Sequence, residues 1–68
     1  KTLLKEGDRG LEVERLQEAL RTRNLYAGPA NGRFSPKSTQ AVKEFQQRRH
    51  LTPDGVAGPR TLRALGLY

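Results

Sequence analysis

The sequence has no cysteine, no methionine and no tryptophan, and only one histidine among its 68 residues. These absences exclude disulfide bonds and a structural zinc site. Because no methionine is present to start the chain, we expect an excised domain or a processed product. A chain this short buries only about 60% of the surface that its unfolded form exposes. We therefore expect residues 1–68 to form one small domain, with its core packed economically from the 34% of residues that are hydrophobic.

Negative charge is scarce relative to positive charge. Thirteen Lys and Arg residues face seven Asp and Glu, which gives a formal net charge of +6. This balance favours acidic partners: nucleic acid, an anionic membrane surface, or a polymer that bears carboxylates or phosphates. No apolar run approaches the roughly 20 residues that a membrane-spanning helix needs, so we expect no insertion into a membrane.

Apolar residues recur at helical spacing in three stretches of the chain. In the first stretch, Val13, Leu16 and Leu20 fall on one face of a helix. The same spacing and the turn residues between the stretches predict helices over about residues 10–23, 36–49 and 59–65. The predicted fold class is all-α, a closed bundle of three helices joined by two ordered loops.

Local signals mark where these helices begin. Ser35 and Pro36 combine a good N-cap with a proline at the first helical position, and Gly58-Pro59 opens the third helix in a similar way. For the first helix we expect Asp8 to accept backbone N–H bonds as a cap.

The two halves of the chain resemble each other. Leu16-Gln17 is echoed by Phe45-Gln46, and each half then carries a turn that ends in glycine. The bundle is therefore predicted to consist of two overlapping helix-loop-helix repeats that share the second helix. Because a glutamine amide both donates and accepts, we expect Gln17 and Gln46 to brace the two loops. The alternative is that they face a groove and bind the amides of a ligand.

A series of short motifs runs in order through residues 4–65. Its members are Leu4, Gly7, Asp8, Gly10, Val13, Leu16, Gln17, Leu20, Tyr26, Gly28, Asn31, Gly32, Phe34, Ala41, Val42, Phe45, Gln46, Leu51, Asp54, Gly55, Val56, Gly58, Pro59, Thr61 and Leu65. Together they resemble the type 1 peptidoglycan-binding domains. The resemblance implies a three-helix fold that attaches bacterial and phage cell-wall hydrolases to peptidoglycan.

The resemblance sets further expectations. It implies a monomer linked to an amidase, a muramidase or a peptidase, in the cell wall or periplasm or in a phage lysis protein. The chain departs from the family pattern at Asn31, where Asp is usual, at Ser35, where Gly is usual, and at Asn24 and His50, which replace glycines after the first two helices. Asn and His are enriched among non-glycine residues at positive φ, so we expect the fold to tolerate both.

The residues predict no catalysis. There is no cysteine nucleophile, and no second histidine to build a metallohydrolase motif. Glu12, Glu14 and Glu18 cluster on one helix, which is typical of a solvated face rather than of two carboxyls held across a cleft. We therefore expect a binding module that is not an enzyme and holds neither a metal nor a cofactor.

A shallow groove between the second helix and the two loops is the predicted ligand site. The candidate ligand-binding residues are Tyr26, Asn31, Arg33, Gln46, Arg48, Arg49 and Asp54. Arginine forks match the free carboxylates of peptidoglycan stem peptides, and a tyrosine ring suits stacking on a sugar. Five of them also have a structural alternative: Tyr26 can close the first loop, Arg48 and Arg49 can complement a helix C-terminus, and Asn31 and Asp54 can shape turns.

Two other classes of function stay open. The positive charge would also suit nucleic acid, but a helix-turn-helix joins its helices by 3–4 residues, whereas about eight or more separate each pair here. We therefore expect no nucleic-acid partner. A structural spacer, as in the prodomains of animal matrix metalloproteases that share this fold, is the second alternative.

Overall fold

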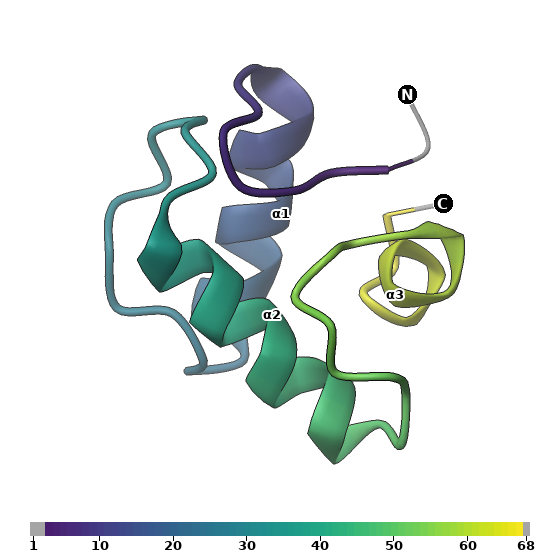
Figure 1. The fold of residues 1–68 in the computed structure, drawn as a ribbon. Helices are drawn as coiled ribbons and strands as arrows, with labels where there is room; N and C mark the ends of the chain where they lie inside the picture. Colours follow the sequence, from purple (N-terminus) through teal and green to yellow (C-terminus); the bar gives the residue numbers. More distant parts are fainter. Residues whose placement is uncertain (1–2, 68) are drawn as a thin grey trace.

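The computed structural model describes residues 3–67. It contains three helices, α1 (Leu11–Thr22), α2 (Pro36–Arg48) and α3 (Pro59–Ala64), and no strand within that range. Figure 1 shows α2 crossing α1, with α3 beside them. The predicted all-α class is confirmed.

The core lies between the three helices and draws on the loops as well. Its side chains are at most 7% exposed and share an apolar character; they are Leu4, Val13, Leu16, Leu20, Tyr26, Phe34, Ala41, Val42, Phe45, Ala57, Leu62 and Leu65. Burial of one leucine or phenylalanine side chain stabilises a fold by about 1.5–3 kcal/mol. Since these residues come from every part of the chain, the loops are as much a part of the packed structure as the helices.

Helix α2 begins as predicted, but α1 does not. The Ser35 side chain accepts a hydrogen bond from Ser38 N at 3.4 Å, with proline directly after it. The prediction that Asp8 caps α1 is wrong: the N-cap is Gly10, which has φ 127° and no side chain to offer. Asp8 Oδ2 instead accepts a bond from Lys5 N at 3.0 Å. Its carboxylate therefore closes the turn before α1.

The two non-glycine residues at the ends of α1 and α2 adopt the left-handed conformation. Asn24 has φ 60° and His50 has φ 58°. In this conformation, the N–H of the next residue reaches back into the last turn, from Leu25 to Leu20 O at 3.0 Å and from Leu51 to Gln46 O at 2.7 Å. The expectation that the fold tolerates these two replacements is confirmed.

The segment before α1, purple in Figure 1, joins both loops to each other. Leu4 and Ala57 exchange two backbone hydrogen bonds, of 3.0 and 2.8 Å. Gly7 N then donates to Phe34 O at 3.0 Å, and Phe34 N donates to Asp8 O at 3.0 Å. Two isolated antiparallel bridges result, Leu4 with Ala57 and Arg9 with Arg33.

The first repeat has both a longer helix and a longer loop than the second, each by three residues. Asn24 lies seven positions after Gln17, whereas His50 lies only four after Gln46. Helix α1 thus runs about one turn farther than α2 beyond the matching glutamine. The first loop has three more residues than the second between the left-handed residue and its turn glycine. The chain therefore returns to an equivalent position in both repeats.

Candidate ligand-binding groove

Gln17 holds the first loop from inside the protein. Its side chain is fully buried. Its Nε2 donates to Arg33 O at 2.7 Å and to Ser38 Oγ at 3.0 Å, with Tyr26 Oη at 3.4 Å. Its Oε1 accepts from Gly32 N at 2.9 Å. The expected bracing role of this glutamine is confirmed.

Gln46 braces the second loop in the same way. Its Nε2 donates to Val56 O at 2.9 Å and to Thr61 Oγ1 and Asp54 Oδ1 at 3.1 Å each. Its Oε1 accepts from Gly55 N at 3.0 Å. The side chain is only 2% exposed. Although Gln46 is also a candidate ligand contact, its amide is engaged within the protein.

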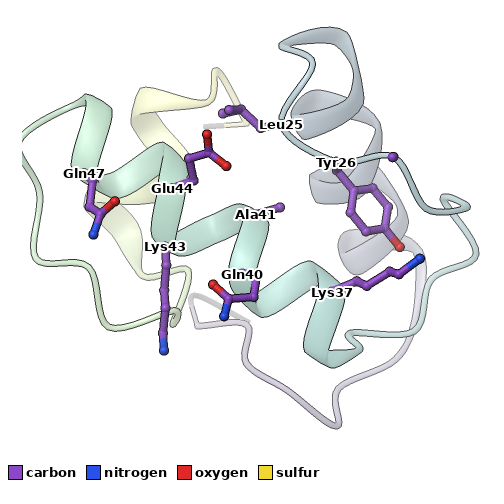
Figure 2. Close-up of a pocket in the computed structure, with 9 residues that line it drawn as sticks. Leu25, Tyr26, Lys37, Gln40, Ala41, Lys43, Glu44 and Gln47 are labelled. Carbon is purple, nitrogen blue, oxygen red and sulfur yellow. The ribbon is translucent and has the colours of Figure 1, made fainter.

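An open groove of about 480 Å³ runs between α2 and the start of the first loop (Figure 2). Its walls combine small or apolar side chains with polar ones; they are Leu25, Tyr26, Ala27, Lys37, Gln40, Ala41, Lys43, Glu44 and Gln47. In Figure 2, Tyr26 and Lys37 lie at one end of the groove and Gln47 at the other. The groove follows about three turns of α2, because residues 37 to 47 span it.

The groove carries more positive than negative charge. Lys37 and Lys43 have no hydrogen bond or ion pair within residues 3–67. Glu44 is paired with Arg48, whose Nη2 lies 3.0 Å from Glu44 Oε2 at an exposed position. Gln40 and Gln47 add neutral amides that can both donate and accept. Such a surface can bind carboxylates and amides together.

Tyr26 borders the groove but is largely a structural residue. It is 7% exposed, and its hydroxyl donates to Pro29 O at 2.9 Å. Its ring lies so close to Gly28 that a methyl group there would come within 2.8 Å of it. The tyrosine therefore closes the first loop over the bundle while one edge of it forms the groove wall.

The other loop borders a separate hollow of about 290 Å³. Two of the sequence candidates, Gln46 and Asp54, line it together with Arg60. Asp54 Oδ1 accepts from Val56 N at 2.9 Å, so this carboxylate shapes its own turn. Asn31 does the same in the first loop, where its Oδ1 accepts from Arg33 N at 3.0 Å.

The two remaining arginine candidates lie away from the groove. The Arg49 guanidinium lies 5.9 Å from the centre of the Phe45 ring, and Arg23 lies 5.8 Å from the same ring. Arg33 is exposed and stands opposite Arg9. Of the seven candidates, only Tyr26 lines the groove. Arg48 is outside it but forms an ion pair with Glu44, which is part of the groove wall.

Sequence reasoning missed the polar stripe that forms the groove wall. Lys37, Gln40, Glu44 and Gln47 recur at spacings of three and four residues, opposite the buried face of α2. That spacing places them on one face of a helix, and it is readable in the sequence. What it does not reveal is that residues 25–27 return along this face and turn it into a groove.

None of the helices in residues 3–67 is long and apolar enough to cross a bilayer. Within the same residues, no three His, Asp or Glu side chains come together to hold a metal ion.

The described residues thus form a three-helix domain with two glutamine-braced loops and an open polar groove. Residues 9–65 match the sequence profile of the peptidoglycan binding domain family. The chain belongs to this family, whose members occur in cell-wall hydrolases such as amidases and endolysins.

Several relatives illustrate the match. The N-acetylmuramoyl-L-alanine amidase CwlL of Bacillus licheniformis is 36% identical over 66 residues, which is 94% of this chain and 18% of CwlL. The crystal structure of the SleB N-terminal domain has a TM-score of 0.92 at 31% identity and covers 94% of this chain and 88% of that one. The Burkholderia AP3 phage endolysin has a TM-score of 0.89 at 32% identity, covering 97% and 25% respectively. The chain spans between 14% and 51% of the length of three curated relatives.

Proposed function

We propose that this chain is a non-catalytic module that binds peptidoglycan through the α2 groove and holds a linked cell-wall hydrolase against its substrate. The observation that carries the proposal is the groove itself, where Lys37 and Lys43, which have no partner among the described residues, lie beside neutral amides and small apolar side chains. Stem peptides offer carboxylates to the lysines and peptide bonds to Gln40 and Gln47. The floor of Ala41 and Leu25 leaves room for either peptide or sugar.

The proposed role in mechanism is local concentration. A tethered module raises the effective concentration of wall polymer that a linked catalytic domain meets. Modest affinity suffices, since an attached hydrolase must still move along the polymer. We propose that the module acts as a monomer outside the cytoplasm, in the wall or periplasm or within a phage lysis protein, joined to an amidase, muramidase or peptidase. The amidase and endolysin relatives support this assignment.

Retention on purified sacculi tests the proposal. We expect the 68-residue chain to bind sacculi at physiological salt. The double variant Lys37→Ala and Lys43→Ala should lose most of this retention, while Arg63→Ala, an exposed arginine on α3, should keep it. Absence of binding by the unaltered chain would overturn the proposal. Equal binding by the unaltered chain, the double lysine variant and Arg63→Ala would show that the groove is not the binding site.

The sacculus assay also distinguishes this proposal from the two alternative functions, a structural spacer and a nucleic-acid-binding domain. A spacer needs no ligand, so it predicts no retention in the same experiment. A nucleic-acid-binding domain predicts duplex binding that falls steeply with salt and exceeds binding to sacculi. A gel-shift titration beside the sacculus assay distinguishes these outcomes.

A further inference from the structure

Arg9 and Arg33 stand directly opposite each other in an antiparallel bridge. Backbone hydrogen bonds flank the pair on both sides, and one of them joins Gly10 N to Gly32 O at 2.9 Å. The two arginines are therefore a non-hydrogen-bonded pair. In this geometry, side chains on the same face of two strands come closest, with Cβ atoms about 4.5–5.5 Å apart.

The bridge places two positively charged residues directly opposite each other. Both residues are exposed, and neither guanidinium has a hydrogen bond or ion pair within that range. Like charges directly opposite each other are destabilising. An anion that contacts both guanidinium groups removes this repulsion, so the free protein favours its binding.

The backbone beneath the pair is fixed before any ligand arrives. The buried amide of Gln17 bonds to Gly32 N and to Arg33 O. Asn31 adds a bond from its side chain to Arg33 N. A ligand at the pair therefore need not order the loop, which lowers the cost of binding.

The fold itself does not require charges at this place. The second repeat has its own bridge to the N-terminal segment, and the residues that stand opposite each other there are Leu4 and Ala57. That apolar pair is buried and contributes to the core. The arginine pair at the other bridge is exposed and contributes nothing to the core, which points to a role outside folding.

We propose that Arg9 and Arg33 form a second binding site, separate from the α2 groove, that takes a phosphate group carried on a cell-wall polymer. A carboxylate presents two oxygens in one plane, which a single guanidinium fork can bind bidentately. The two free oxygens of a phosphodiester diverge tetrahedrally from the phosphorus atom, so each oxygen can accept from a different guanidinium on the two bridged segments. The choice of a wall polymer rests on the proposed function.

A titration with inorganic phosphate tests the site independently of any polymer. The 68-residue chain, labelled with nitrogen-15, is titrated with sodium phosphate and, at matched ionic strength, with sodium chloride. We expect the Nε–H signals of Arg9 and Arg33 to move with phosphate only. The variant Arg9→Gln with Arg33→Gln should bind phosphate at least ten-fold more weakly.

The matched control is Arg15→Gln with Arg63→Gln. It removes the same two charges from exposed positions on α1 and α3 that have no partner within residues 3–67. We expect its phosphate affinity to stay within two-fold of the unaltered chain. Equal losses in both double variants, or unmoved signals at Arg9 and Arg33, would overturn the site.

Sacculi provide the test of the polymer. We compare sacculi that carry phosphodiester polymers with the same sacculi after hydrofluoric acid has removed them. Retention of the unaltered chain should be several-fold lower on the sacculi that have lost their phosphodiester polymers. The variant Arg9→Gln with Arg33→Gln should bind both preparations equally. Equal retention of the unaltered chain on both would overturn the wall-phosphate assignment and leave the groove intact.

Two further outcomes separate the proposals. A chain that fails to bind the stripped sacculi contradicts the proposed groove function rather than the arginine site. The chain could also bind duplex DNA more tightly than either sacculus preparation, in a way that requires Arg9 and Arg33. That result would overturn the assignment to a wall polymer in favour of nucleic acid.

Discussion

Gln17 makes the same bonds around the first loop that Gln46 makes around the second. In each repeat the amide oxygen accepts from a glycine N–H, and the amide nitrogen donates to the next carbonyl and to a hydroxyl in the following helix. Each buried glutamine therefore makes three equivalent bonds, and each amide nitrogen has one further polar neighbour, Tyr26 Oη in the first repeat and Asp54 Oδ1 in the second. The loops owe their shape to these glutamines as much as to their own turn residues.

Replacement of Gln17 by leucine should destabilise the domain strongly. Leucine keeps the bulk but leaves Gly32 N–H, Arg33 C=O and the Ser38 hydroxyl without their partner. Each buried group left unsatisfied costs about 1–3 kcal/mol. We expect the free energy of unfolding, measured by urea denaturation, to fall by about 3 kcal/mol or more. Gln47→Leu, at an exposed position, should change it by less than about 0.5 kcal/mol; similar losses in both variants would contradict the bracing role.

Gly32 should tolerate a side chain less well than Gly66, although both have nearly the same backbone conformation. Their φ angles are 79° and 80°. A methyl group on Gly32 would lie 3.0 Å from Gly10 O, whereas on Gly66 it would meet nothing within 4 Å. Both alanine variants carry a conformational cost of about 1–2 kcal/mol. We expect thermal unfolding to show a clearly larger loss for Gly32→Ala; equal losses would mean that the close backbone approach is unimportant.

Glycine at position 50 should stabilise the domain. His50 has φ 58° at the end of α2, where any side chain with a Cβ is strained. Glycine relieves this strain but loses more chain entropy, so we expect a net gain of about 0.5–1 kcal/mol in unfolding free energy. Asn24→Gly should gain less, because asparagine tolerates this conformation better. A loss of stability in His50→Gly, measured by chemical denaturation, would contradict this explanation.

Neutralising Glu44 should strengthen binding to sacculi. Glu44 is the acidic residue among those that line the groove, and its pairing with Arg48 occupies that arginine. In Glu44→Gln the groove gains positive character, and we expect retention to rise about two- to five-fold at low salt, with a smaller gain at high salt. Stability should change by less than about 1 kcal/mol, since the pair is exposed. Glu18→Gln breaks the similar Arg21 pair outside the groove and should leave retention unchanged.

The order and class of the elements could be predicted because local signals agree with the packing. Apolar residues at helical spacing, such as Val13, Leu16 and Leu20, are all fully buried. Ser35 caps α2 as its position predicts. Asp8 misled the prediction because the same residue type closes turns and caps helices. Only the path of the chain around Gly10 decides between the two.

The candidate site could be predicted only in part, because contacts distant in sequence create it. The sequence suggests that Arg49 binds a carboxylate or complements the C-terminus of the helix, yet its guanidinium lies over the Phe45 ring. Lys37 and Gln40 read as an ordinary solvated helix face until the first loop returns beside them. The Arg9–Arg33 pair depends on a bridge between segments 24 positions apart, for which the sequence carries no local signal.

The N-terminal segment also determines how the domain bears mechanical load. Residues 4 to 10 are bonded to the second loop through Leu4 and to the first loop through Gly7 and Gly10. A pull applied at residue 3 first strains the Leu4–Ala57 bonds and then those to Phe34 and Gly32. Detachment of the N-terminal segment would therefore separate Arg9 from Arg33 and release the first loop, which forms one wall of the groove.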